Sequence, residues 1–405
     1  REETIAFEPF TFRYHPVFRQ RDLFSRARRD LQEWTRRHRT HLDSLGVSAG
    51  HAFGTWWKRY HHEHPEYFAL QPDGTRSGYP NPHTVKLCQS NPEVWTQWLR
   101  NVKTTLRRNP AQRVFNSAPN DGSTSGICIC EDCRSWDTLE NAPRWRLNWE
   151  GVNQEYVAMS DRYLTFSNRL AAMLKAAYPG RDLLVSQLAY GPSKPPPVTV
   201  PPAENVVVGY VGHFPVAGNG WRRQEKEGWR GWSEKLSQLI FRPNVFYYSA
   251  GHHGIPTLAL QNTMEDFAFL AQHRCAGVVF DGTPRHFSPL APQLYIMTKL
   301  AWNPRQDGTQ LLEDFYQRGF GRAADKIRDY YATMEEAHMA ILNWARWRPS
   351  MGNIKTVAEN IPTFYTPARL DKAEALLDEA EALVEDQPEV YRDRVAFVRL
   401  GLTYT

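Results

Sequence analysis

The chain has 405 residues, with 49 Lys and Arg residues, 44 Asp and Glu residues and a formal net charge of +5. Hydrophobic residues make up 41% of the sequence and charged residues 23%, a globular composition that excludes an intrinsically disordered chain. No stretch approaches the roughly 20 apolar residues of a membrane span. The basic residues are spread along the chain, except for a run over 26–39 that suits the solvated face of a helix. We therefore expect neither a membrane span nor a nucleic-acid partner.

Strand and helix patterns alternate up to residue 302. Apolar runs typical of strands lie at 10–15, 45–53, 84–88, 113–118, 183–188, 206–211, 245–249 and 277–280. Patterns typical of helices lie between or after them, at 22–39, 92–106, 156–178, 225–240, 264–273 and 290–300. This alternation predicts a (β/α)8 TIM-type barrel over residues 1–302. No Gly-x-Gly-x-x-Gly turn follows the first strand, which counts against a dinucleotide-binding fold.

Beyond residue 302 only helical patterns follow. They lie at 311–318 and 323–347, and a last pair begins at Thr366-Pro367. In that last region apolar residues recur at helical spacing, for example Leu370, Ala373 and Leu377. The sequence therefore predicts a C-terminal helical extension, residues 303–405, packed on the barrel.

Polar side chains follow the predicted strands at their C-terminal ends, which meet at one mouth in such a barrel. Cleavage of a glycosidic bond commonly uses one carboxylic acid to protonate the leaving oxygen and a second carboxylate as nucleophile or base. Asp121 and Asp281 are the most economical pair, with Asn120 helping Asp121 as general acid/base and Asp281 as the second carboxylate. Glu66 and Glu131 are the alternative candidates for a catalytic carboxylate. Both aspartates precede glycine, so a plain turn-forming role is the alternative for each.

Histidine and aromatic side chains are expected to line the same mouth. The chain contains 14 Trp, 18 Tyr and 20 Phe, and aromatic rings pack against the CH-rich faces of sugars, although a barrel core uses the same residues. The residues expected to bind substrate are His51, Trp57, Tyr190, Tyr210, His213, Tyr248, His252, His253 and Trp302. No His-x-x-x-His spacing for a metal occurs on a helix, so we expect catalysis without a cofactor.

The cysteines suggest a separate structural site. Cys128, Cys130 and Cys133 form a tight cluster, and Cys88 ends the preceding predicted strand. Four thiolates suit a closed structural zinc site, whereas an oxidising compartment favours one or two disulfides among the same residues. Both alternatives stay open, and Cys275 is expected to be a buried free thiol in either case.

Several blocks of this sequence resemble the domain-of-unknown-function family 4838, a family of bacterial proteins found beside polysaccharide-degrading enzymes. The blocks are His64-Pro65-Glu66-Tyr67-Phe68, Cys88 to Glu93, Asn116 to Gly122 with the cysteine cluster, and Leu300 to Pro304 before Phe315-Tyr316 and Phe320-Gly321. Together they span roughly residues 45–335. The family is distantly similar to α-glucuronidase and β-hexosaminidase barrels. The resemblance implies a glycoside hydrolase-like barrel in an exported protein, secreted or periplasmic, that acts on carbohydrate.

The resulting hypothesis is an exo-acting glycoside hydrolase. Basic and histidine residues near the mouth favour an acidic sugar. One alternative is a sialidase-like hydrolase, in which Arg13 or another arginine pairs with the sugar carboxylate and a histidine serves as acid or base. Another is a non-catalytic carbohydrate-binding barrel. The sugar, the linkage and the oligomeric state are not predicted.

Overall fold

The structure is a computed structural model that covers most of the chain. The residues it describes are 14–23, 32–40, 45–47, 50–122, 124–214, 218–236, 238–244, 255–280, 286–344 and 359–403. Parallel strands and helices alternate along the first part of the described chain, and helices follow. This arrangement is a mixed α/β fold.

Six strands form one parallel sheet, whose inner face is apolar. In spatial order they are β1 (Gln20–Asp22), β8 (Cys275–Val279), β7 (Leu239–Phe241), β6 (Val206–Tyr210), β5 (Leu184–Ala189) and β2 (Val114–Asn116). The first strand pairs with the last, which curls the sheet. One buried cluster collects a residue from each of five strands and two from a nearby segment, namely Leu45, Val47, Val114, Leu184, Val207, Ile240 and Val279. These residues surround a common interior.

The segment 45–47 lies between the two edges of the curled sheet. The Gln20 side chain donates to the Val47 carbonyl at 2.9 Å and accepts from the Val47 amide at 3.1 Å. On the other side, Asn116 donates to the Gly50 carbonyl at 2.7 Å. Side-chain amides thus tie the segment to both edges of the sheet, and the Ala52 amide also donates to the Ala118 carbonyl at 3.0 Å. The described residues of the predicted strand 45–53 do not form a strand, and Gly46 among them adopts a φ of 79°, outside the extended region.

Helices cover the outside of the sheet and extend beyond it. They are α1 (Gln32–Arg37), α2 (Trp56–Tyr60), α3 (Pro92–Arg108), α4 (Glu131–Arg134), α5 (Ser160–Ala177), α6 (Asn219–Ser233), α8 (Leu260–Gln272), α9 (Ala291–Trp302), α10 (Gly308–Phe320), α11 (Ala324–Trp344), α13 (Pro367–Val384) and α14 (Glu389–Thr403). Short 3₁₀ turns are η2 (Pro65–Tyr67), η3 (Gly191–Ser193), η6 (Ser288–Leu290) and η7 (Gly321–Ala323). A hairpin of β3 (Arg144–Trp149) and β4 (Val152–Val157) precedes α5.

The beginning of α3 follows the sequence signals closely. Asn91 caps the helix, since its side chain accepts from the Glu93 amide at 2.9 Å, and Pro92 takes the first helical position. The apolar residues four apart on one face, Val94, Trp98, Val102 and Leu106, are all buried. This predicted helix is confirmed.

Other predicted elements are displaced. A strand at 10–15 falls partly outside the described residues, and its described part is not a strand; the first strand is β1. The segment 84–88 makes only an isolated antiparallel bridge, between Phe68 and Leu87. The predicted helix 225–240 ran too far, because α6 ends at Ser233 and β7 follows. The predicted strand 245–249 lies outside the described residues.

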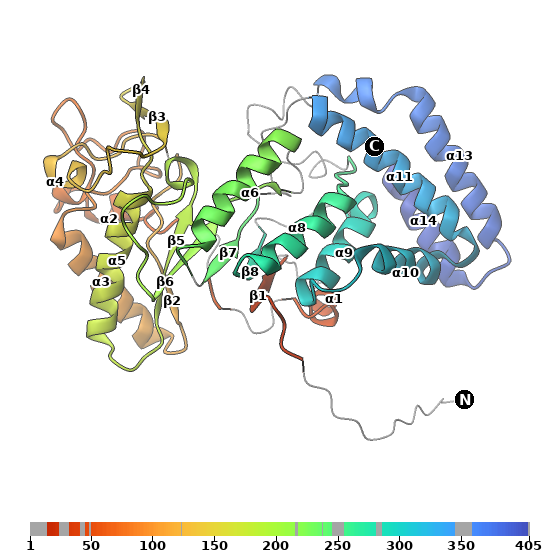
Figure 1. Cartoon of the computed structure of the whole chain (residues 1–405), viewed down its shortest axis with the longest axis horizontal. Coiled ribbons are helices and arrows are strands. Elements are labelled where there is room, and N and C mark those ends of the chain that lie inside the picture. The colour runs from red at the N-terminus through yellow and green to blue at the C-terminus, as the bar shows by residue number, and fades with distance from the viewer. Residues whose placement is uncertain are drawn as a thin grey trace.

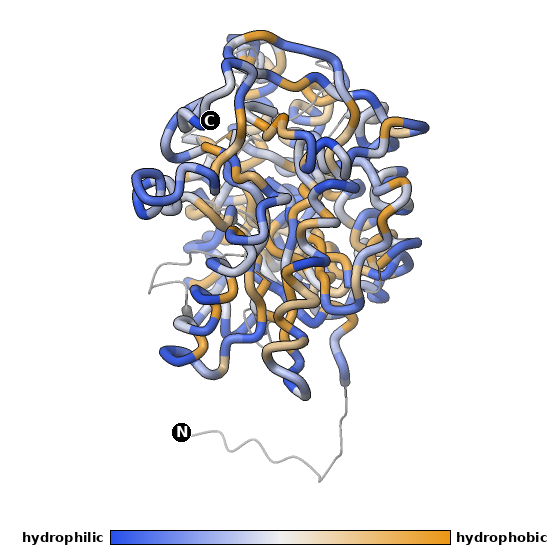
Figure 2. Tube along the Cα trace, turned by 90° about the vertical axis from the view of Figure 1, so that its left-hand side faces the viewer, coloured by the Kyte–Doolittle hydropathy of each residue, from blue (hydrophilic) through white to orange (hydrophobic). Residues whose placement is uncertain are grey.

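The C-terminal helices have their own core. Figure 1 shows α10, α11, α13 and α14 grouped at one end of the molecule, with the hairpin β3–β4 at the other. A second buried cluster contains Tyr331, Leu377 and Val398 from these helices together with Leu258, which precedes α8. In Figure 2 hydrophilic residues lie mainly on the outer turns of the chain. The boundary at residue 302 between a barrel domain and a C-terminal helical extension remains a prediction.

Within the described part of the chain, no helix is both long enough and apolar enough to cross a membrane.

Candidate functional site

The C-terminal ends of neighbouring parallel strands carry polar side chains. Asp121 follows β2, Tyr190 follows β5, His213 follows β6 and Arg242 follows β7. These four strands are adjacent in the sheet, and parallel strands end at the same edge. His51 joins them from the segment that lies against β2. We call this set of residues the mouth.

Asp121 and His51 form a carboxylate–imidazole pair. His51 Nε2 lies 3.7 Å from Asp121 Oδ1, and the aspartate side chain is 64% exposed. His51 Nδ1 lies 2.5 Å from the Pro119 carbonyl oxygen. Because a carbonyl only accepts, Nδ1 carries the hydrogen, which leaves the Nε2 lone pair facing Asp121. Burial lowers the pKa of His51, with smaller opposing effects from Pro119 and Asp121. A neutral His51 is therefore available to accept a proton.

Lys86 holds the turn at Asp121 through hydrogen bonds to backbone carbonyls. Its side chain is almost fully buried, and Nζ donates to the backbone carbonyls of Thr84 at 2.8 Å and Asp121 at 2.5 Å. Burial lowers the pKa of Lys86 to about 7, against an opposing effect of Asp121. Lys86 thus fixes the turn, and in its protonated form it adds a positive charge that acts on His51.

A buried charge cluster supports the other side of the mouth. Glu225 on α6 accepts from the His213 amide at 3.0 Å and forms an ion pair with Lys194. Burial alone would raise the pKa of Glu225, but Lys194 and His213 lower it to about 2. Burial lowers the pKa of His213, which Glu225 opposes. Arg242, which follows β7, acts electrostatically on both His213 and His51.

Tyr190 supplies an aromatic ring to the mouth. Its ring centroid lies 6.2 Å from that of His51. The ring packs on a small apolar cluster of Ala118, Leu188 and Val211 at the top of the sheet interior. Tyr190 therefore lies near the His51 ring at the mouth.

Asn120 holds the loop in place from a buried position. Its side-chain oxygen accepts from the Phe53 amide at 3.1 Å, and its nitrogen donates to the Val85 carbonyl at 2.9 Å. Both amide groups are thus engaged with backbone, and the residue is 2% exposed. These contacts fix the position of Asn120 next to Asp121, and its part in catalysis stays a prediction.

Two predicted mouth residues point elsewhere. Tyr210 is 1% exposed, and its hydroxyl donates to the Glu225 carbonyl on α6 at 3.0 Å. Successive strand residues point to opposite faces, and since Val207 lies inside, Tyr210 must face outward. Trp302 ends α9, and its carbonyl accepts from Tyr14, which precedes β1. Trp302 therefore lies toward the N-terminal ends of the strands, away from the mouth.

Glu66 and Trp57 lie in the aromatic region before α3. The Glu66 carboxylate is half exposed and pairs with His64 at 3.0 Å. Trp57 stacks on His61 with ring centroids 4.7 Å apart and packs edge-on against Phe68. These contacts account for both side chains as parts of a packed turn. Four predicted residues, Asp281, Tyr248, His252 and His253, lie outside the described residues.

Sequence reasoning missed several cations of the mouth. Lys86, Lys194 and Arg242 were not predicted as site residues, nor was Glu225. The signal for Arg242 was available, because it follows β7 two residues after the inward-facing Ile240. Lys86 and Glu225 depend on loop and helix packing that no local pattern reports.

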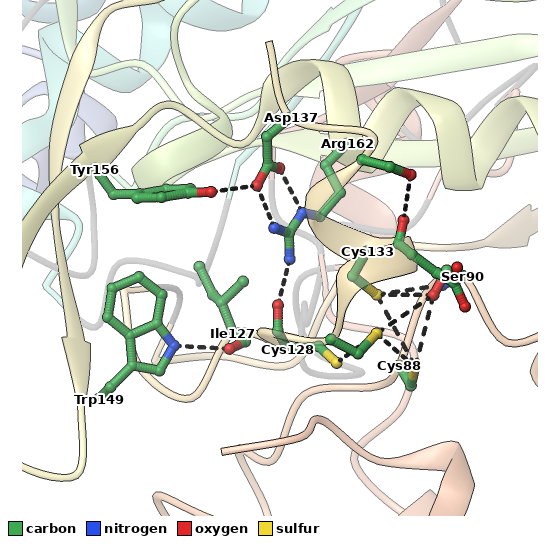
Figure 3. A network of polar contacts seen from close by, with 12 residues as sticks. Cys88, Ser90, Ile127, Cys128, Cys133, Asp137, Trp149, Tyr156 and Arg162 are labelled. Atoms are coloured by element: carbon green, nitrogen blue, oxygen red, sulfur yellow. Dashed lines mark hydrogen bonds and ion pairs between the residues drawn. The ribbon is translucent and has the colours of Figure 1, made fainter. Parts of the chain in front are cut away.

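The four clustered cysteines converge on one another, and Figure 3 shows three of them, Cys88, Cys128 and Cys133. All four Sγ atoms lie within 4.8 Å of one another. Individual distances are 3.5 Å between Cys128 and Cys130, 3.6 Å between Cys88 and Cys130, and 4.0 Å between Cys88 and Cys133. None of them is disulfide-bonded. Cys275 lies apart in β8, where it donates to the Gly277 carbonyl at 3.1 Å.

Fold and site together define a parallel α/β protein with a polar site at the strand ends. Residues 3–332 match the family model described as Domain of unknown function (DUF4838), so the chain belongs to this family and the resemblance seen in the sequence is confirmed. No curated protein matches the chain.

Among solved structures, the chain is similar to a mutant of the O-GlcNAc hydrolase of Thermobaculum terrenum. The identity is 11% and the TM-score 0.40, with 78% of this chain and 64% of that chain covered. The chain thus spans less than two thirds of that protein's length.

Proposed function

We propose that this protein is an exo-acting glycoside hydrolase, with its active site at the mouth. The observation that carries the proposal is the exposed Asp121 carboxylate, 3.7 Å from His51 at the C-terminal edge of the parallel strands. In this proposal Asp121 is the general acid/base, and Asp281, on the segment after β8, is the second carboxylate. We also propose that the curled sheet is part of a complete (β/α)8 barrel. The protein is proposed to be exported from the cell.

An acidic sugar is the proposed substrate class. Lys86 and Arg242 both act on His51, and Arg242 and Lys194 both act on His213, so the described mouth is rich in cations. A guanidinium can bind a carboxylate through two parallel hydrogen bonds, so Arg242, which is buried and also donates to Asn244, is the proposed ligand of the sugar carboxylate. Tyr190 would pack against the ring of the sugar.

The test is a hydrolysis screen with aryl glycosides of neutral, uronic and sialic sugars. Release of the aryl group from uronic substrates, and not from neutral ones, is expected. Release from sialosides alone would favour the sialidase-like alternative, with Arg242 in place of the predicted Arg13. Ligand binding by calorimetry without product would favour a non-catalytic carbohydrate-binding barrel and would contradict the proposal.

A further inference from the structure

We propose that Cys88, Cys128, Cys130 and Cys133 bind one Zn²⁺ ion in a closed, structural site. A tetrahedral Zn²⁺ with Zn–S bonds of about 2.3 Å places its sulfurs about 3.8 Å apart. The three sulfur separations of 3.5, 3.6 and 4.0 Å straddle this value. Four sulfur ligands fill a tetrahedral shell, which leaves no open position for water or substrate.

The mutual approach of all four sulfurs separates zinc from disulfides. A disulfide requires a cysteine to approach only its own partner. Here each Sγ lies within 4.8 Å of each of the other three, so the four side chains point to a single centre. Three of the cysteines are buried, and Cys130 is partly exposed. Such convergence is what one shared ion requires.

Neighbouring groups suit thiolates. The Leu70 amide donates to Cys128 Sγ at 3.3 Å, and the Ser90 amide donates to Cys133 Sγ at 3.4 Å. Zn²⁺ would replace four thiol protons, which pass to solvent, and leave a net charge of −2 on the site. The Arg76 guanidinium acts electrostatically on Cys88, Cys128 and Cys130 and offsets part of this charge. Donors of this kind orient metal ligands and support their charge.

The zinc site would join two loops that reach the mouth. The Ile129 amide donates to the Leu70 carbonyl at 3.1 Å, beside the cluster. Two residues before Cys88, Lys86 holds the Asp121 turn. One small cavity is lined by Lys86, Asn120 and Cys128 among others, so the cluster and the mouth loop adjoin. We infer that the ion fixes the loops on which Asp121 depends.

The experiment measures the metal in the full chain purified under reducing conditions from zinc-supplemented medium. Elemental analysis is expected to give one zinc per chain. Replacement by Co²⁺ is expected to produce the visible bands and thiolate charge-transfer absorption of tetrahedral cobalt with sulfur ligands. Both readouts are independent of hydrolase activity, so they are informative whatever the substrate screen gives.

Matched variants identify the ligands. Cys133→Ser is expected to lose the cobalt charge-transfer spectrum or the metal, whereas Cys275→Ser, which also changes a buried cysteine, keeps one zinc per chain. If Cys133→Ser does not fold, the zinc content and the cobalt spectrum of the wild-type protein still test the proposal. Zinc content well below one per chain, or an intact mass lower by two hydrogens for each disulfide, would overturn the proposal.

Discussion

At the scale of single residues, Asp121 is the side chain whose change should matter most. Asp121→Asn keeps the size and the turn but removes the group proposed to donate and accept the proton. General acid–base catalysis contributes typically 10²–10⁴-fold. We expect kcat on the preferred aryl glycoside to fall by at least about a hundredfold, with substrate affinity by calorimetry changed little.

A surface carboxylate provides the control for Asp121. Glu204 is 96% exposed and lies 3.9 Å from Lys175, so Glu204→Gln should retain wild-type kcat. If Asp121→Asn turns over substrate at the wild-type rate, the assignment of Asp121 is wrong.

The sequence located some mouth residues because strand ends can be recognised locally. Asp121 and His213 follow apolar runs that end in a turn, and the structure places both at the strand ends. Tyr210 was misplaced because the inward or outward direction depends on the register of β6, and a shift of one residue exchanges the two faces. Lys86 is recognisable only once the chain has folded over it.

At the scale of elements, a buried ion pair ties α5 to the cysteine loop. Arg162 is 2% exposed and donates to Asp137 Oδ1 at 2.6 Å and to the Cys128 carbonyl at 2.7 Å, as Figure 3 shows. Asp137→Asn leaves the guanidinium buried without its counter-charge. We expect the free energy of unfolding in urea to fall by about 3–5 kcal/mol.

An exposed ion pair on the hairpin is the comparison. Arg144 and Glu155 lie 3.1 Å apart and are more than half exposed, so Glu155→Gln should cost less than about 1 kcal/mol. If the two variants lower the free energy of unfolding equally, burial does not make the Arg162–Asp137 pair more important than an exposed pair.

His338 makes the C-terminal helices sensitive to acid. It is buried in α11, and burial lowers its pKa to about 4. Between pH values near 4 and 6.5 the unfolded chain binds a proton that the folded protein does not, so stability falls as pH decreases through this window. His338→Leu should remove this loss and be more stable than wild type by about 2 kcal/mol near pH 5.

Urea unfolding at several pH values tests the role of His338. The two proteins should differ little above about pH 7, where His338 is uncharged in both the folded and the unfolded chain. His83 is exposed, and His83→Gln should keep the wild-type pH dependence. A constant difference between His338→Leu and wild type at all pH values would exclude proton linkage as its cause.

Elements were predictable where local signals and packing agree. The Asn-Pro beginning of α3 and the apolar runs of β5 and β6 are examples. Leu239 and Ile240 of β7 were assigned to the end of a helix, because a short apolar run fits either structure. The hairpin β3–β4 was missed since its outward residues are polar and its turn contains Glu150 at a φ of 50°.

At the scale of the whole molecule, the sequence predicted the alternation of strands and helices and the helical end. It did not predict how the sheet is completed, because the side-chain amides of Gln20 and Asn116 help to hold the segment between the two edges. Nor did it predict where the last helix packs. That helix, α14, lies against η6, the turn that follows the segment containing Asp281.

The packing of α14 on η6 depends on a glycine. A Cβ at Gly401 would lie 2.3 Å from Ser288 Oγ and 3.1 Å from Ser288 Cβ, and Ser288 is buried. Gly401→Ala should therefore push the helix away and lower the free energy of unfolding by about 1–3 kcal/mol, seen as a lower Tm. A Cβ at Gly319 in α10 would meet no atom within 4 Å, so Gly319→Ala should raise stability by about 0.5–1 kcal/mol. If Gly401→Ala stabilises the protein as Gly319→Ala does, α14 does not pack closely against η6 at this point.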